Sequence, residues 1–434
     1  MTSPLIRYGI DDRPPLGTLL LFGLQWLAVV GVSTIVMGKV LAALHFTAPA
    51  DQFLYMQKLF FATGMALLAQ LFVGHRLPLV IGPAAILLVG ILASGARDTA
   101  ALYSSIMIGG ALLALLCATG LFRYVARLFT YRVVATILML IAIAITPTVL
   151  ALVVDTPEPS DAVRHLLFAL GLLVTMVAGD RLLRGAWRAT LLLWALALGS
   201  ALCFWLLPDT APSAAPADQP LFASLFRDVT APLHWDLGLI LSFLICFIAL
   251  AVNDLGSIES LGKLLQPPAM AQRLTRGMTV TGLANVLAGF LGVVGVVNFS
   301  LSAGIISANG NASRLSFLPA ALCLVLMAFS PSLIALFWMV PPVVIGAVLL
   351  YIMSLQLATG FLVALGERTF GFPDALVISI PVMLSVLVSF LPQAVVTAFP
   401  PLLVPIAGNG FVIGTLAVLL LEHVLLRPSS PTPP

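Results

Sequence analysis

The chain has 434 residues, of which 61% are hydrophobic and only 9% are charged, and its net charge is +3. Its mean hydropathy is +1.14. Soluble globular proteins carry about 25% charged residues, so this composition cannot build a water-facing surface and leaves no soluble domain of ordinary size. The basic residues are scattered over short loops, which excludes the concentrated positive surface of a nucleic-acid-binding protein.

The N-terminal residues 1–15 are polar and lack the apolar core and the small-residue cleavage site of a signal peptide. We expect them to be cytoplasmic. The apolar run that begins at Leu16 is long enough to span a bilayer and to serve as the insertion signal.

Apolar runs between charged or Pro/Gly-containing breaks predict an all-α membrane protein of fourteen segments. A membrane helix needs about 20 apolar residues, so the length allows about twelve to fourteen spans. The segments are 18–38, 53–74, 79–94, 99–119, 132–154, 162–178, 188–207, 237–262, 275–292, 301–311, 316–335, 342–364, 372–391 and 408–427. The third and the tenth are short and rich in Gly, Ala, Pro or Ser.

The distribution of Lys and Arg sets the expected orientation. With fourteen spans and the N-terminus inside, 15 basic residues fall in the inside loops and 5 in the outside loops. Because inside loops carry the excess of Lys and Arg, both termini are expected in the cytoplasm, with the chain in the inner (plasma) membrane.

A polar stretch at 208–235 divides the chain into two predicted repeats of seven segments, 16–207 and 236–427. We expect this stretch to be an extracytoplasmic connector and residues 428–434 to be a cytoplasmic tail. An odd number of segments per repeat inverts one repeat relative to the other, as in many secondary transporters.

Segments three and ten are weakly similar to each other in sequence. Leu77–Ile86 and Gly295–Gly304 each join a β-branched stretch to small residues that open a helix. We therefore predict short β-stretches in both segments, each followed by a half-helix that begins near the bilayer midplane. Such a helix start exposes backbone N–H groups and a positive dipole end to a substrate.

The residues that open these two half-helices are candidate ligands. Gly82 lets a ligand approach the backbone, and Pro83 is tolerated in a first turn. Ser300 and Ser302 supply possible caps and hydroxyl donors. The alternative is that these small residues only allow helices to pack closely.

Segment eight contains the most costly polar residues, Asn253, Asp254, Ser257 and Glu259. An acidic group within a span costs several kcal/mol unless it pairs, protonates or faces water, so Asp254 is a functional candidate, with a structural ion pair as the alternative. Glu259 is interpreted as a headgroup-level residue or a partner of Lys263.

Three further polar residues, Asp374, Glu422 and His423, lie near the ends of predicted spans and are interpreted as interfacial. The four cysteines lie inside apolar runs and have no metal-ligand spacing. We find no acid–base pair, metal-ligand cluster or phosphate loop. We therefore expect neither an enzyme nor a cofactor.

The chain resembles the nucleobase–ascorbate transporter family, which includes the xanthine/uracil permeases. The resemblance rests on Tyr8–Pro15, Gly23–Gln25, Leu77–Gly82, Leu283–Gly292 and Asn309–Arg314 and covers nearly the whole chain. It implies seven plus seven inverted segments and commonly a homodimer. It further implies a core domain of segments 1–4 and 8–11, a gate domain of segments 5–7 and 12–14, and an elevator-type motion.

Several polar positions depart from the family pattern. The eighth-segment glutamate that grips the base falls at Asn253, and the tenth-segment Glu/Gln–Asn pair falls at Leu301 and Ser302. The ninth-segment acidic residue falls at Thr281, and the first-span histidine at Trp26. Each missing buried partner typically costs about 1–3 kcal/mol, so the transport fold is better supported than the substrate.

Together these observations predict a secondary active transporter, in a lipid bilayer, that moves a small planar nucleobase such as uracil or xanthine, with H⁺ as the coupling ion. The predicted substrate-binding residues are Asn253, Ser300, Leu301, Ser302, Gly304, Gly82, Pro83, Ala84, Ala85, Gln25 and Phe299. The predicted proton-coupling residues are Asp254, Glu259 and Ser257. The alternatives are a small-anion transporter of the sulfate-permease-like fold and a non-transporting membrane receptor or scaffold.

Overall fold

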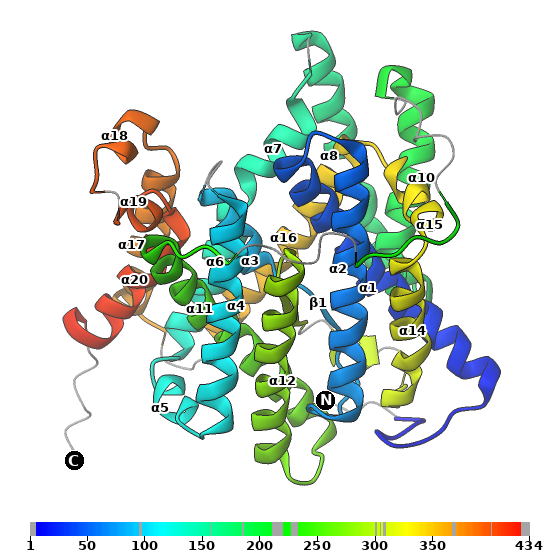
Figure 1. Cartoon of the computed structure of the whole chain (residues 1–434), viewed down its shortest axis with the longest axis horizontal. Coiled ribbons are helices and arrows are strands. Elements are labelled where there is room, and N and C mark those ends of the chain that lie inside the picture. Colours follow the sequence, from blue (N-terminus) through cyan, green and yellow to red (C-terminus); the bar gives the residue numbers. More distant parts are fainter. Residues whose placement is uncertain are drawn as a thin grey trace.

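The computed structural model is mostly helical (Figure 1). The residues that it describes are 6–94, 98–156, 158–184, 186–210, 220–226, 233–299, 302–303, 305–306, 310–366, 370–400 and 402–426.

Among the described residues, the first half of the chain holds one short strand and ten α-helices. In order they are α1 (Leu16–His45), α2 (Pro49–Phe72), β1 (Ile81–Pro83), α3 (Ala85–Ala93), α4 (Thr99–Ala118), α5 (Phe122–Ala126), α6 (Tyr131–Ala144), α7 (Thr146–Val154), α8 (Pro159–Leu182), α9 (Ala186–Ala189), α10 (Leu191–Leu206) and the 3₁₀ turn η1 (Pro208–Thr210).

The second half also holds one short strand. Its elements are α11 (Leu237–Leu265), α12 (Met270–Leu291), β2 (Val296–Asn298), the 3₁₀ turn η2 (Arg314–Phe317), α14 (Leu318–Ala328), α15 (Pro331–Trp338), α16 (Pro342–Leu365), α17 (Phe372–Ser389), α18 (Gln393–Thr397), α19 (Val404–Ala407), α20 (Gly410–Leu420) and the π-helical turn η3 (Leu421–Leu425).

Four of the helices begin at a polar residue whose side chain accepts a hydrogen bond from a first-turn N–H. These residues are Asp98 before α4, Thr130 before α6, Asp236 before α11 and Asn409 before α20. Each satisfies one of the N–H groups that a helix start leaves without an intrahelical partner.

Within the described ranges, seven helices or continuous helix pairs are long and apolar enough to cross a membrane. They are α1, α4, α6 with α7, α8, α11, α16 and α17. A further pair, Arg314–Ala328 with Pro331–Phe337, is bent by 103° and counts as an eighth if it is one span. The expected multi-pass membrane protein is thus confirmed, whereas the number fourteen and the inverted repeats stay predictions.

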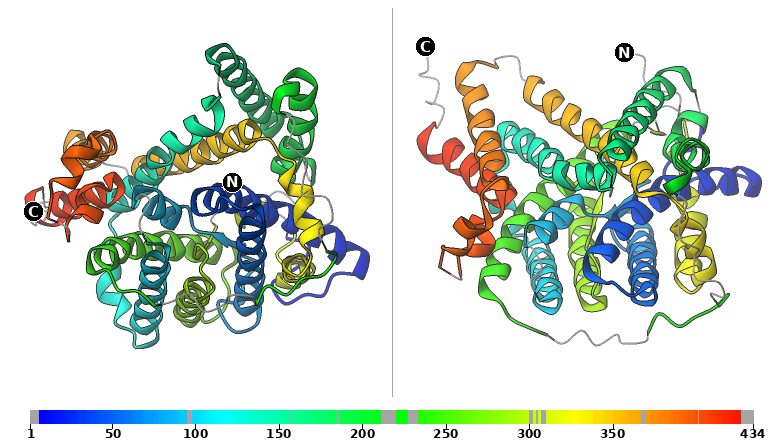
Figure 2. Two further views of the ribbon diagram at one scale, coloured as in Figure 1. Left: turned by 45° about the horizontal axis from the view of Figure 1, so that its top comes forward. Right: turned by 90° about the horizontal axis from the view of Figure 1, so that it is seen from above.

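The helices pack in two sets. The strand-bearing set contains α1–α4, α11, α12 and α14, in which α12 packs on α4 and α2, and α14 on α2 and α1. The flanking set contains α6–α8, α10, α16, α17 and α20, in which α16 packs on α6, α7 and α8. Figure 2 shows α16 beside α8, on the other side of the molecule from α4 and α12.

The two strands form an antiparallel pair that joins the halves of the chain. Its register pairs Ile81 with Asn298, Gly82 with Val297 and Pro83 with Val296. Hydrogen bonds from Ala84 N to Gly295 O and from Phe299 N to Val80 O, both 2.8 Å, extend the pair at its ends. The β-stretches predicted in segments three and ten are therefore confirmed.

Close approach of α4 and α12 depends on glycine. A Cβ atom on Gly282 would lie 2.5 Å from the backbone nitrogen of Ala114 and 2.7 Å from the carbonyl oxygen of Gly110. Both distances are shorter than van der Waals contact, so a methyl group requires the helix backbones to separate. Small residues at helix crossings are a common packing device in membranes.

This crossing gives a stability prediction. Gly282→Ala should lower the thermal unfolding midpoint of the purified protein in detergent, because overpacking costs about 1–3 kcal/mol. The control is Gly171→Ala in α8, where no atom lies within 4 Å of the added methyl group. Equal midpoints for the two variants would contradict the packing argument.

Candidate functional site

Asn298, the last residue of β2, is the centre of a buried hydrogen-bond network. Its backbone N–H and its side-chain Nδ2 donate to Oδ1 of Asp254 at 3.1 and 2.7 Å. Its carbonyl oxygen accepts from the Ser257 hydroxyl at 3.0 Å. Two residues of α11 thus hold the end of β2 in place.

The network continues to α12 and α2 through Thr281. The Thr281 hydroxyl oxygen accepts from Asn298 Nδ2 at 3.3 Å and from Gln70 Nε2 at 3.0 Å. Gln70 Nε2 also donates to the carbonyl oxygen of Gly277 at 2.9 Å. All of these side chains are buried, so each unpaired group would carry its full desolvation cost.

His75, between α2 and β1, completes the network from the other side. Its Nδ1 accepts from the backbone N–H of Leu77 at 2.9 Å, so its Nε2 carries the proton that faces Asn298 Oδ1 at 3.3 Å. Burial lowers the pKa of His75 to about 4, so the imidazole is neutral at neutral pH. The orientation of the Asn298 amide follows, with Oδ1 toward His75 and Nδ2 toward Asp254.

Asp254 brings a carboxyl group to the strand pair from α11. The residue is 0% exposed, and its Oδ2 has no hydrogen-bond partner in the part of the chain that the structure describes. No ion pair is found for Asp254 among those same residues. A buried carboxylate without a cationic partner is costly, so this group has a strong reason to bind a proton or to meet a ligand.

Asn253 lies one turn before the buried Ser257 on the same face of α11, at the edge of its covered side, whereas Glu259 lies on the exposed side. Asn253 is half-buried, and Gly256, Glu259, Ser260 and Lys263 are exposed. No hydrogen bond from the Asn253 carboxamide to another described residue is present. The alternative of an ion pair between Glu259 and Lys263 is not observed in the described structure.

The predicted residues of segment three lie at the strand pair. Gly82 and Pro83 are in β1 and are buried, as is Ala84, whereas Ala85 is half-buried. Helix α3 starts at Ala85 without a side-chain cap. Its first N–H groups are therefore of the kind that bind ligands at a helix start.

Phe299 covers Gly82. A Cβ atom on Gly82 would lie 2.7 Å from the Phe299 ring and 3.3 Å from the Ser33 hydroxyl oxygen. Phe299 is only half-buried, so part of its ring remains accessible. Gln25 is 4% exposed on α1, the helix that packs against β1.

Ser302 links the segment after β2 to the segment before β1. Its hydroxyl oxygen accepts from the backbone N–H of Val80 at 3.0 Å, and its hydroxyl donates to the carbonyl oxygen of Phe299 at 3.1 Å. The hydroxyl is thus used within the protein. Three other predicted ligands, Ser300, Leu301 and Gly304, lie outside the described residues.

Asp374 and Glu422, which were interpreted as interfacial residues, both contact Arg132. The Arg132 Nη1–Asp374 Oδ1 distance is 2.9 Å, and the Arg132 Nε–Glu422 Oε2 distance is 2.8 Å. Glu422 is only 2% exposed. His423 also has a protein partner, with Nε2 3.0 Å from the carbonyl oxygen of Leu128. These contacts join α6 to α17 and η3 within the flanking set.

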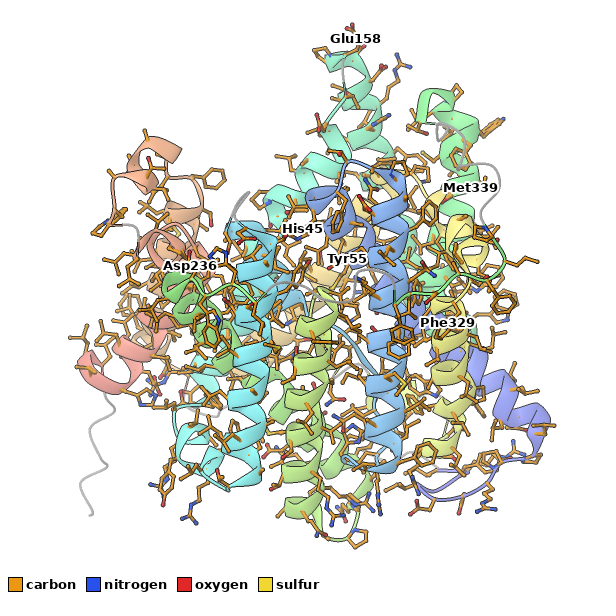
Figure 3. The ribbon with its side chains drawn as sticks, in the orientation of Figure 1. His45, Tyr55, Glu158, Asp236, Phe329 and Met339 are labelled. Carbon is orange, nitrogen blue, oxygen red and sulfur yellow. The ribbon has the colours of Figure 1, made fainter. Side chains whose placement is uncertain are left out.

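An aromatic cluster lies beside the loop that leads into β2. The hydroxyl of Tyr55 accepts from the backbone N–H of Val294 at 3.2 Å and from the Tyr103 hydroxyl at 3.3 Å. His45 at the end of α1 packs on both rings, and Figure 3 shows His45 and Tyr55 near each other. The Tyr55 hydroxyl thus holds the backbone at Val294, two residues before β2 begins.

The sequence analysis did not identify Gln70, His75 or Asn298. Asn298 had a visible signal, because it is the one polar residue in the apolar stretch Val293–Phe299. Gln70 and His75 precede segment three, and nothing in the local pattern indicated that Gln70 contacts α12 or that His75 contacts β2. Their role depends on contacts across more than 200 positions of sequence.

The network gives a test with a matched control on the same helix, α12. Thr281→Val should lower the unfolding midpoint, because Gln70 Nε2 and Asn298 Nδ2 lose an acceptor at a cost of about 1–3 kcal/mol. Thr279→Val is the control, since the exposed Thr279 hydroxyl bonds only to its own helix, at Thr275 O. A midpoint that falls equally in both variants would argue against the network.

The fold is similar to that of a solved anion transporter domain. The transmembrane domain of the cyanobacterium bicarbonate transporter BicA matches with a TM-score of 0.65 at 17% sequence identity, covering 92% of this chain and 99% of that domain. At this identity the likeness concerns the fold alone.

Relatives in sequence are permeases and transporters. The nucleobase transporter PlUacP of Paenibacillus larvae is 24% identical over 86% of this chain and 87% of its own length. The putative purine permease YwdJ of Bacillus subtilis is 25% identical over 94% of this chain and 96% of its own length. The model of the permease family (Xan_ur_permease) matches residues 17–394. The resemblance drawn from the sequence motifs is therefore confirmed, and the chain belongs to this family of xanthine/uracil permeases.

Proposed function

We propose that this protein is a secondary active transporter for a small planar nucleobase such as uracil or xanthine, working by proton symport. The observation that carries the proposal is the buried strand pair, at which α3 begins uncapped and to which α11 brings Asp254. Membership of the permease family and the nucleobase and purine relatives support the cargo.

Recognition of a nucleobase is proposed to begin at Asn253. A carboxamide offers one acceptor and two donors, which complement the alternating N–H and C=O groups of a pyrimidine or purine dione. The half-buried ring of Phe299 offers an aromatic surface for stacking, and the first N–H groups of α3 offer further donors. The other proposed contacts are Gly82, Pro83, Ala84, Ala85, Gln25, Ser300, Leu301, Ser302 and Gly304.

Coupling is proposed to depend on Asp254. The carboxyl group lies on the buried side of α11, one residue from Asn253, so a proton bound there removes a buried charge next to the ligand. Ser257 holds β2 beside it, and Glu259 lies further along the exposed side of α11. Binding of substrate and proton would then favour each other through the shared strand end.

Movement is proposed to involve the two packing sets. In this proposal the strand-bearing set is the core domain that carries the ligand, and the flanking set is the gate domain, with an elevator-type displacement between them. A cavity of about 780 Å³ lies between the sets, lined by α1 and α3 on one side and by α7, α16 and the start of α20 on the other. We place the protein in the inner membrane as a homodimer with both termini cytoplasmic.

A small-anion transporter is the second candidate. The fold shared with the BicA transmembrane domain favours it, as does the absence of the family's carboxylates at Asn253 and Leu301, since a carboxylate beside the ligand repels anions. The buried Asp254 argues against it for the same electrostatic reason.

Uptake into proteoliposomes separates the candidates. We expect labelled uracil or xanthine to accumulate and excess unlabelled nucleobase, but not sulfate or bicarbonate, to compete. Asn253→Ala should weaken nucleobase binding about tenfold, because a hydrogen-bonded pair is lost. Ser260→Ala, on the exposed side of the same helix, is the control. Competition by the anions alone would favour the second candidate, and the absence of any flux would favour a receptor or scaffold.

Removal of the Asp254 charge tests coupling. In Asp254→Asn the remaining oxygen can still accept from Asn298, so nucleobase binding should survive while uptake no longer responds to a pH gradient. Glu259→Gln is the control at the second acidic residue of α11. It should leave the response of uptake to the pH gradient intact. Accumulation by Asp254→Asn at the wild-type level under the same gradient would refute the coupling role.

A further inference from the structure

The chain's beginning is paired with the loop that follows segment ten. Residues 7–12, here called the N-terminal strap, run parallel to residues 310–314, with a β-bridge between Tyr8 and Asn311. The backbone bonds are Arg7 N to Gly310 O at 2.8 Å, Ala312 N to Tyr8 O at 2.9 Å and Arg314 N to Ile10 O at 3.0 Å. The Ser313 hydroxyl adds a bond to Asp12 O at 2.6 Å.

The loop is buried although it connects two segments. Asn311, Ala312 and Ser313 are 1%, 0% and 0% exposed. Three of the six strap residues are exposed and the other three are half-buried, so the strap forms the outer layer over the loop. Buried loop backbone needs internal partners, and the strap supplies them.

Gly310 connects this pairing to the segment after β2. Its N–H donates to the carbonyl oxygen of Ile306, four residues earlier, at 2.8 Å, and its φ of +69° is the left-handed conformation typical of glycine at the end of a helical turn. Its own carbonyl oxygen is the one that accepts from Arg7. The strap thus binds a residue that is itself bonded to Ile306.

The other end of the same segment contacts the strand pair. Ser302, one turn before Ile306, accepts from Val80 N immediately before β1. Ser302 is therefore held beside the strand pair, and Gly310, which is bonded to Ile306, is held by the strap.

Side chains extend the attachment to α1 and α2. Arg314 contacts Asp11 of the strap, with a 2.7 Å Nε–Oδ1 distance, and donates from Nη1 to the carbonyl oxygen of Leu71 at the end of α2. Phe317, three residues later, stacks on Trp26 of α1 with ring centroids 4.2 Å apart. The strap, α1, α2 and residues 310–317 form one connected unit.

We propose that the N-terminal strap is a positioning element of the ligand site. By holding Gly310 and the buried loop, it fixes the distance and direction of the segment that begins at Ser302 and Phe299. The strap touches no ligand, and its contribution to affinity acts through these residues. This inference rests on the proposed nucleobase site.

The substitution Arg7→Pro tests the strap, because it removes one backbone hydrogen bond between the strap and the loop. Arg7→Pro removes the N–H that donates to Gly310 O at 2.8 Å and leaves only the longer bond of 3.4 Å from the Tyr8 N–H, whereas Arg7→Ala removes the same side chain and keeps both N–H groups. In the purified full-length protein, we expect the Kd for xanthine or uracil to rise about three- to tenfold in Arg7→Pro and to stay within about twofold of wild type in Arg7→Ala. In proteoliposomes the KM should rise with little change in the maximal rate.

A second variant tests the same pairing from the side of the buried loop. Ser313→Ala removes only the hydroxyl bond to Asp12 O and should weaken binding in the same direction. The two changes should be less than additive in the double variant, since both release the same strap. Lower unfolding midpoints with an unchanged Kd would overturn the positioning role and leave the strap a purely structural attachment.

The same binding measurements distinguish a failure of the strap inference from a failure of the proposed nucleobase function. A wild type that binds nucleobase, with Arg7→Pro and Arg7→Ala equal in Kd, would refute the strap alone. A wild type that binds only sulfate or bicarbonate would refute the nucleobase assignment, and the same Kd ratio between the variants, measured with that anion, would then decide the strap. A wild type that binds neither would overturn both.

Discussion

Backbone polar groups within a membrane must find partners in the protein, and the structure meets this constraint by pairing two interrupted segments with each other. An extended stretch in hydrocarbon is tolerated only where it is covered by protein or lines a cavity. Here β1 and β2 satisfy each other, and Asn298 at the end of β2 has its N–H, C=O and side chain all bonded. Residues of α11, of α12 and of the connection between α2 and β1 therefore stabilise the strand pair.

The same arrangement explains why a costly carboxyl group lies at this place. Asp254 binds the backbone and the side chain of Asn298, so it stabilises the strand end while one oxygen remains without a partner among the described residues. Asp254 is thus both a structural partner of β2 and the proposed proton-binding group. Any change of charge at Asp254 acts directly on the element that positions the proposed ligand.

Much of the fold could be predicted because the membrane imposes simple rules on sequence. Apolar runs located the long helices, and the Gly–Pro stretch at 82–83 located the interruption before α3. The contacts of the site could not be predicted in the same way. His75 meets Asn298 across 223 positions, and Glu422 meets Arg132 across a similar distance, so no local pattern connects them. The position of a polar residue near a span end does not show which residue it will contact.

The network also changes how the departures from the family pattern are interpreted. The resemblance places the family's ninth-segment acidic residue at Thr281, which suggests that an acidic group has been lost. In the structure Thr281 and Asp254 both contact Nδ2 of Asn298, at 3.3 and 2.7 Å. A carboxyl group from α11 thus reaches the network in which the hydroxyl from α12 takes part. This network therefore contains an acidic group supplied by α11, so the threonine at 281 is no argument against the proposed proton coupling.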